Sequence, residues 1–112
     1  LNVREFSLER LAEGYFGNIL KEIALGQAFL ASASVVFIWS AVLRRTMSKY
    51  GERGLRYIFL DCGHICQNLL LVCTALGLKA CPVGAFFDED LNDLLHLDGE
   101  EETVIFLATV GK

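Results

Sequence analysis

The residues best suited to chemistry lie in the stretch DCGHICQNLLLVC, from Asp61 to Cys73, which holds three of the four cysteines and one of the two histidines. Thiolates and imidazoles bind metals, and paired thiols carry redox chemistry. On a helix Cys62 and Cys66 share one face, whereas His64 is turned about 200° away from Cys62. The spacing of a Cys-x-x-Cys redox pair is absent. The pattern therefore favours core packing for the cysteines over a redox pair, and it predicts no metal site.

The same stretch has a polar side. Asp61, His64 and Asn68 follow one another at i, i+3 and i+7, with Tyr57 one turn earlier, so they form one hydrogen-bonding face opposite the apolar stripe. Such a face must find partners for its donors and acceptors. Neighbouring loops, a ligand or a second subunit are the alternatives.

A long helix positions these residues. Apolar side chains recur every three to four residues from Leu55 to Leu76, and Gly77 is placed to end the helix. The later part, Leu69 to Val72, is apolar all round, and a helix without a polar side must be covered on every side. We therefore expect the central helix of the fold or a subunit interface.

Helices and strands are mixed along the remaining chain. We expect helices from Ser7 to about Ile23, from Ala41 to about Tyr50 and from Asp88 to Leu95, an extended segment over Ala80 to Phe86, a turn at Asp98 and Gly99, and strands over Ser34 to Trp39 and Thr103 to Val110. This order favours an α+β fold with helices packed on one sheet. Two strands alone are not stable, so further strands must come from another segment or another subunit.

The uncharged run from Ile23 to Leu43 raises the possibility of a transmembrane helix. Its interior contains Gly26, Gln27 and several serines, and its most apolar part is the β-prone stretch from Val35 to Trp39. A short helix followed by a buried strand explains this composition better. We therefore expect no membrane partner, and a small membrane protein remains the alternative.

The composition constrains the class of protein. With 112 residues the chain is expected to be a single domain spanning residues 1–112, and its 54% hydrophobic content exceeds what a lone small domain needs. The net charge of −4 argues against nucleic acid as the main partner, although Arg44 to Arg56 is locally basic. Four cysteines without a secretory signal indicate reduced thiols and a cytoplasmic protein.

Four segments in order resemble the C-terminal half of the nitroreductase-like flavoenzymes: KYGERGLRY, DCGHICQNLLL, ALGLKACPVGAFFDEDLNDLL and IFLATVGK. The branch they resemble most is the SagB-type dehydrogenases, which oxidise azoline rings in peptides. The resemblance spans about Gln27 to Lys112. It implies an α+β fold with helices on a central, mostly antiparallel sheet that is incomplete in this chain. It also implies two interlocked subunits with FMN at their interface, which would account for the surplus of apolar residues.

The resemblance also implies site residues. The loop Val83-Gly84-Ala85 matches the segment that lies against the flavin ring, where a glycine allows close approach. Lys49 and Tyr50 match a catalytic Lys-Tyr pair, in which the lysine takes a proton while the flavin accepts a hydride. Lys112 falls where a C-terminal basic residue approaches the FMN phosphate. A solvent-exposed lysine at a helix end is the alternative for Lys49.

One departure from the family concerns the phosphate. The family's arginine-rich N-terminal segment, which grips the FMN phosphate, has no counterpart before Leu1. We therefore expect a longer natural chain, a partner that supplies the missing N-terminal half, or loss of the flavin site. The resulting hypothesis is a homodimeric FMN-dependent oxidoreductase for a small-molecule or peptide substrate, with azoline dehydrogenation or nitro or quinone reduction as its reaction. A scaffold subunit that has lost flavin binding is the alternative.

Overall fold

A computed structural model describes residues 1–112. In chain order the elements are α1 (Gly17–Ile23), α2 (Phe29–Ser32), β1 (Val35–Val42), α3 (Leu43–Tyr50), a 3-10 turn η1 (Gly51–Arg53), α4 (Gly54–Ala75), β2 (Lys79–Val83), α5 (Asp88–Leu94) and β3 (Glu102–Gly111). The expected α+β class is confirmed.

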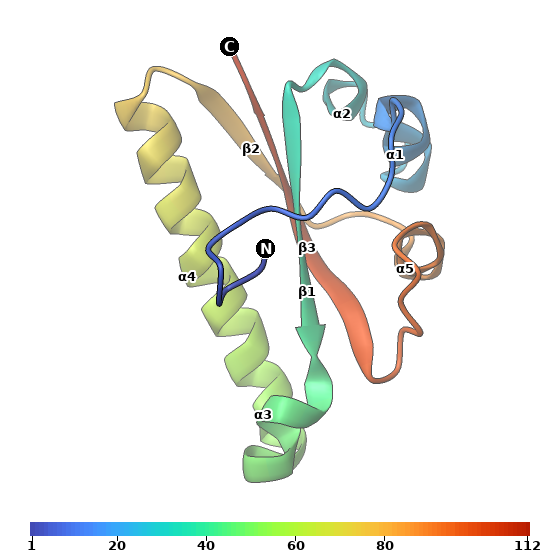
Figure 1. Cartoon of the computed structure of the whole chain (residues 1–112), viewed down its shortest axis with the longest axis vertical. Helices are drawn as coiled ribbons and strands as arrows, with labels where there is room; N and C mark the ends of the chain where they lie inside the picture. The colour runs from blue at the N-terminus through green and yellow to red at the C-terminus, as the bar shows by residue number, and fades with distance from the viewer.

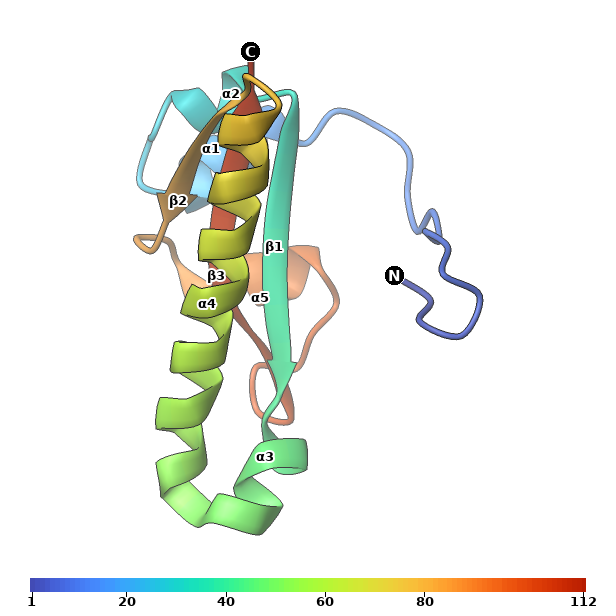
Figure 2. The same ribbon diagram turned by 90° about the vertical axis from the view of Figure 1, so that its left-hand side faces the viewer.

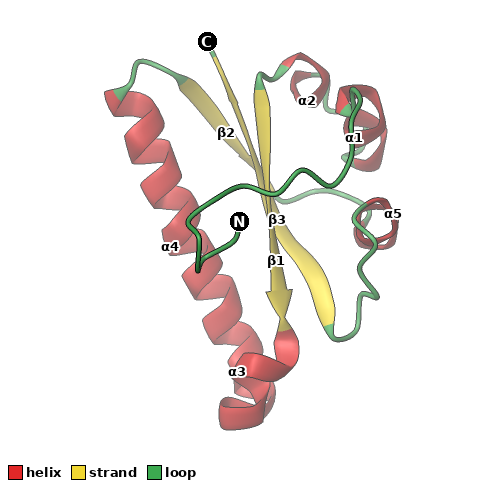
Figure 3. Ribbon diagram, viewed as in Figure 1, coloured by secondary structure: helices red, strands yellow, loops and turns green.

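The sheet has three antiparallel strands in the order β1-β3-β2 (Figure 3). The third strand, β2, comes from the segment expected only to be extended, so the chain itself supplies one strand beyond the two that were predicted. Val35 pairs with Val110, and Lys79 pairs with Gly111. Pro82 is tolerated because β2 is an edge strand, where a missing N–H donor can face away from the ladder.

Helices cover the two faces of the sheet unequally. Figure 1 shows α4 alone on one side, with α1, α2 and α5 on the other. The main core lies on the three-helix side, and its buried residues are Leu20, Ile23, Ala24, Leu30, Val83, Leu91, Val104 and Leu107. Their burial supplies the main hydrophobic stabilisation of the chain.

The long helix agrees with the sequence prediction. The buried residues of α4 beyond its first turn are Ile58, Cys62, Cys66 and Cys73, all on one stripe. Gly77 has a φ of 72°, its N–H donates to Thr74 O at 3.1 Å, and the N–H of Leu78 donates to Cys73 O at 2.8 Å. This pair of bonds satisfies the last carbonyls of the helix in a Schellman motif.

The helix expected from Ser7 is wrong over its first half, because α1 begins only at Gly17. Leu8 and Leu11 are 86% and 88% exposed, so the apolar stripe of this segment has nothing in the chain to pack against. A short helix without such packing is only marginally stable. Figure 2 shows the N-terminal segment as an irregular arm extending from the body.

The uncharged run is not a membrane helix. Between Ile23 and Leu43 the chain ends α1, forms α2 and continues as β1, as the strand interpretation predicted. The helical stretch Leu43–Ala75 is long and apolar enough to cross a membrane by length and composition alone. That finding is weak evidence, because the core helix of a soluble protein meets the same criterion.

Candidate functional site

The loop after β2 is held in place by two contacts with the α1–α2 connection. Gln27 Nε2 donates to Ala85 O at 3.1 Å and to Ala24 O at 2.8 Å. At the end of the loop, the N–H of Phe87 donates to Ile23 O at 2.9 Å. Val83, where the loop begins, is buried in the core. The backbone of Gly84 and Ala85 is therefore fixed from both sides.

This fixed loop leaves hydrogen-bonding capacity unused. Gly84 and Ala85 are exposed, and neither N–H donates to a group within the chain. A Cβ added to Gly84 would meet only the Phe106 ring, at an ordinary contact distance of 3.5 Å. Since the fold itself does not require glycine here, close approach of an external group is a reason for it. Two free amides on a rigid loop can bind an acceptor-bearing ring edge.

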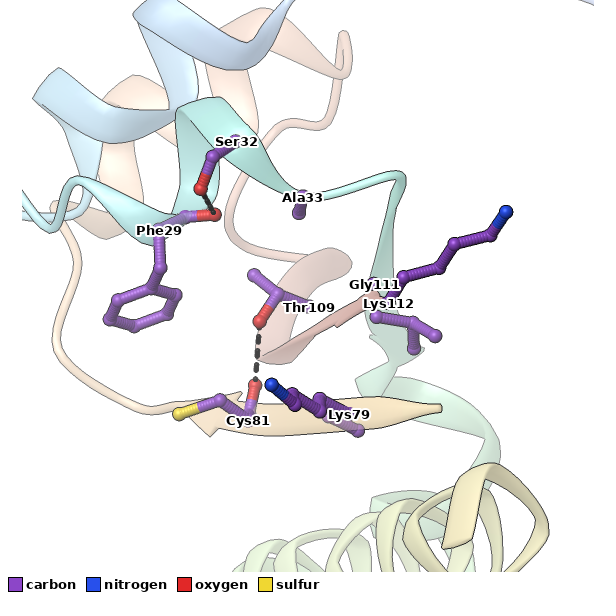
Figure 4. A pocket seen from close by; sticks show the side chains of 10 residues that line it. Phe29, Ser32, Ala33, Lys79, Cys81, Thr109, Gly111 and Lys112 are labelled. Carbon is purple, nitrogen blue, oxygen red and sulfur yellow. Dashed lines mark hydrogen bonds between the residues drawn. The ribbon is translucent and has the colours of Figure 1, made fainter. Parts of the chain in front are cut away.

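Lys112 directly follows β3 and lies beside the start of β2, whereas the Val83-Gly84-Ala85 loop follows the end of β2. Lys112 lines a cavity of about 310 Å³ together with Lys79, Cys81, Thr109 and other residues of β2, β3 and α2. Thr109 Oγ1 donates to Cys81 O at 3.4 Å across the two strands. In Figure 4 the Lys112 ammonium extends away from these two residues. Two lysines at one cavity are suited to an anionic group.

Lys49 and Tyr50 end α3, and both are exposed. The Tyr50 ring meets the Tyr57 ring edge to face, with centroids 4.9 Å apart. Lys49 Nζ lies 5.0 Å from the centroid of the Tyr50 ring, a cation–π contact. The pair therefore lies on an accessible surface, next to an aromatic residue from α4.

One chain does not bring all the predicted site residues together. Val83 pairs with Leu107 and Lys79 with Gly111, so the loop and Lys112 are separated by about 13 Å of strand. Lys49 and Tyr50 lie at the opposite end of α4, a helix of 22 residues and about 33 Å in length (Figure 1). A site that uses all of them therefore requires a second chain.

The polar face of α4 has no partner within the chain. Asp61, His64 and Asn68 are all exposed, and none takes part in a side-chain hydrogen bond between α4 and another element. Bonding to neighbouring loops is therefore wrong as an explanation of this face. A ligand or a second subunit stays a hypothesis.

The cysteines of α4 have the packing role that the sequence predicted. Cys62, Cys66 and Cys73 are buried and unpaired. Burial raises the pKa of the Cys62 thiol, with a further contribution from Cys66, and burial raises the pKa of Cys66 as well. A raised pKa keeps these thiols protonated, and a protonated thiol is a poor nucleophile and metal ligand.

Comparison with known proteins assigns the fold to a family. The sequence pattern of the family described as "Nitroreductase family" matches residues 3–112, which is nearly the whole chain. The chain belongs to the nitroreductase family. Members of this family are generally oxidoreductases.

Two curated relatives extend this result. A protein of Methanocaldococcus jannaschii named as a nitroreductase is 38% identical over 106 residues, which are 95% of this nitroreductase-family chain and 52% of the relative. Trifolitoxin operon protein TfxC of Rhizobium leguminosarum bv. trifolii is 26% identical over 98% of this chain and 31% of its own length. The chain thus spans about half the length of the first relative and a third of the second.

Solved structures share the fold. A structure from Anabaena variabilis described as a nitroreductase has a TM-score of 0.79 and 33% identity, covering 87% of this chain and 20% of that one. A chain of the E. coli microcin synthetase McbBCD complex with truncated pro-MccB17 bound has a TM-score of 0.83 and 20% identity, covering 95% and 40%. At that identity the second likeness shows the fold alone.

Sequence reasoning missed two contributors to the site of this nitroreductase-family chain. Gln27 fixes the loop that contains Gly84. The feature of the sequence that could have identified it is its amide side chain inside an otherwise largely apolar, uncharged run. Lys79 joins Lys112 because β2 and β3 pair in antiparallel register, and that contact depends on a strand the sequence indicated only as extended.

Proposed function

We propose that this chain forms part of an FMN-dependent oxidoreductase in which the loop Val83-Gly84-Ala85 contacts the flavin. FMN, when bound, would accept or donate a hydride. The observation that carries the proposal is the rigid loop with two unpaired backbone donors and a glycine that the fold does not require. Such donors would hold the polar edge of the ring without any need for reorganisation on binding.

Lys112 and Lys79 would bind the phosphate end of the cofactor. Both line one cavity and neither forms an ion pair in the chain. Lysine ammonium groups bind phosphate as point charges, so two at one cavity support this role. Lys79 begins β2, Lys112 directly follows β3, and the loop lies at the other end of β2. This order fits an extended molecule lying along β2.

Lys49 and Tyr50 would come from a second subunit. They lie at the opposite end of α4 from Lys112, so in one chain they are too far from the loop to share a substrate with it. In an interlocked homodimer, or with another partner chain, this surface would face the other chain's loop. Lys49 Nζ would receive the proton released from the substrate carbon, and Tyr50 would position the substrate.

Azoline dehydrogenation in a peptide is the reaction we favour. The resemblance of four sequence segments to the SagB-type dehydrogenases supports a role in peptide modification, and the 26% identity to a trifolitoxin operon protein agrees with it. Reduction of nitro or quinone compounds is the second candidate, supported by the 38% identical relative.

We also propose a cytoplasmic location, which the four unpaired cysteines fit.

Anaerobic mixing of the full-length, flavin-loaded protein with substrate tests this choice. An azoline-containing peptide should bleach the flavin absorbance, and Lys49→Ala should slow that bleaching by about a hundredfold because it removes the proton acceptor. Lys21→Ala, at a half-buried lysine on α1 outside the proposed site, is the control. Bleaching by a reduced nicotinamide followed by nitro reduction, with no response to the peptide, would favour the second candidate.

A further inference from the structure

The positive charge of the chain is concentrated on one surface. Five of the ten basic residues lie between positions 44 and 56, on α3, η1 and the first turn of α4, and Glu52 is the only acidic residue among them. We call this the basic surface, and its cations are Arg44, Arg45, Lys49, Arg53 and Arg56. The ion pairs of the chain are Arg10 with Glu13 and Lys21 with Glu22, so none of these five cations is neutralised.

The basic surface is accessible, and its apolar side is already in use. All five cations are exposed. On the inner side of α3, Met47 packs so closely on Gly54 that a Cβ there would lie 3.2 Å from Met47 Cα. What α3 and the first turn of α4 present outward is therefore charge together with the Tyr50–Tyr57 pair. Unpaired cations beside aromatic rings favour an anionic partner with apolar or planar groups.

The size and surroundings of the basic surface limit the partner. The helix α3 has eight residues and is about 12 Å long. Directly beside it, the N–H of Leu43 donates to Glu101 O at 2.8 Å, at the end of a segment from Asp88 to Glu102 that has eight acidic residues and no lysine or arginine. A long polyanion such as nucleic acid would be repelled by this segment. A short anionic stretch can occupy the basic surface alone.

We propose that the basic surface binds a short acidic segment of a peptide substrate. The inference rests on the proposed function, because Lys49 and Tyr50 lie within the same surface. It adds that the substrate is recognised through carboxylates flanking the reacting group. Attraction to the surface would speed association and would weaken as salt screens the charges.

Fluorescence anisotropy on the full-length protein, after incubation with FMN, tests the inference. The probe is a labelled peptide rich in Asp and Glu, compared with the same peptide carrying Asn and Gln and with a short single-stranded DNA. The double variant Arg45→Glu/Arg53→Glu should weaken binding of the acidic peptide about tenfold, since each exposed ion pair contributes little by itself. The control Arg4→Glu/Lys21→Glu makes the same charge change elsewhere and should leave the affinity unchanged.

Three results would overturn the inference: no binding of the acidic peptide, equal loss in the control variant, or tighter binding of the DNA than of the peptide. Flavin absorbance is recorded on the same samples, and circular dichroism verifies that the variants fold. Protein that binds the peptide but takes up no FMN would overturn the proposed function alone. Protein that binds FMN but binds the acidic peptide and its Asn and Gln counterpart with equal affinity would overturn this inference alone.

Discussion

Among single residues, Gly84 and its neighbours determine whether the loop can contact a cofactor. The family resemblance of the sequence predicted that Gly84 contacts a flavin. The structure adds that the fold leaves room for a side chain at this position, so packing within the chain does not explain the glycine. The contribution of Gln27 could not be predicted, because a side chain pairing with a backbone 58 positions away depends on tertiary structure. Lys49 and Tyr50 were placed on a helix end, where the structure confirms that they are.

Gly84→Ala separates a structural role from a cofactor role. The new Cβ meets the Phe106 ring at 3.5 Å, an ordinary contact, so the free energy of unfolding should change by no more than about 0.5 kcal/mol. The affinity for FMN should fall about tenfold or more, because a methyl group would hold the ring away from the backbone donors. Denaturant unfolding and FMN titration measure the two quantities. A variant that loses stability but keeps its FMN affinity would show that the glycine serves the fold.

Gln27→Ala tests whether the loop must be fixed. It removes the hydrogen bonds to Ala85 O and Ala24 O, and the free energy of unfolding should fall by about 1–2 kcal/mol. FMN affinity should fall as well, because a mobile loop pays an ordering cost on binding. Asn18→Ala, at an exposed amide on α1, is the control and should alter neither quantity. Unchanged FMN affinity in Gln27→Ala would mean that the loop is fixed by other contacts.

At the scale of elements, periodicity and terminal residues predicted α4 well because its signals are local. The buried stripe and the Gly77 end signal both agree with the structure. The N-terminal helix failed for the opposite reason: its spacing was suitable, but the chain contains nothing for Leu8 and Leu11 to contact. The β2 strand was underestimated, since an edge strand with a proline is identified only by the β3 register.

The turn between α5 and β3 should be sensitive to acid. Asp98 Oδ1 accepts the N–H groups of Glu100, Glu101 and Glu102, each at 3.0 Å. These bonds, with that from Glu102 largest, hold the pKa of Asp98 below its ordinary value of 3.8. A lowered folded-state pKa stabilises the protein above the unfolded pKa, and that contribution is lost as the pH falls through the folded-state value.

Asp98→Ala should therefore reduce the free energy of unfolding at neutral pH. The difference from the unaltered protein should shrink as the pH falls below about 3.8. Denaturant unfolding across this pH range measures it, with Glu9→Ala as an exposed carboxylate control. A difference that stays constant with pH would show that the carboxylate charge at Asp98 does not stabilise the turn.

For the whole molecule, the uncovered side of α4 is the dominant feature. Leu71 and Val72, near the C-terminal end of α4, are 58% and 55% exposed, and Phe59, near its start, is 57% exposed. Apolar surface of this extent marks an interaction site. The sequence indicated that this helix must be covered, and the structure confirms that the chain covers only one stripe. The sequence resemblance predicted a second subunit on this helix, and that stays a prediction.

Val72→Lys tests the proposal that a second chain packs on α4. A buried lysine without a partner is costly, so the variant should shift the full-length protein from dimer to monomer in sedimentation velocity. Ile19→Lys, a 47% exposed position on α1, is the matched control and should leave the dimer intact. Equal dimer populations in both variants would place the interface elsewhere.

FMN titration of the full-length protein, after removal of bound flavin, tests most directly whether this nitroreductase-family chain helps to build a flavin site. We expect saturable binding of one FMN per chain, weakened by Gly84→Ala. Flavin fluorescence that does not change on addition of protein, in a sample shown to be folded and dimeric, would contradict it and would favour a scaffold that has lost the cofactor.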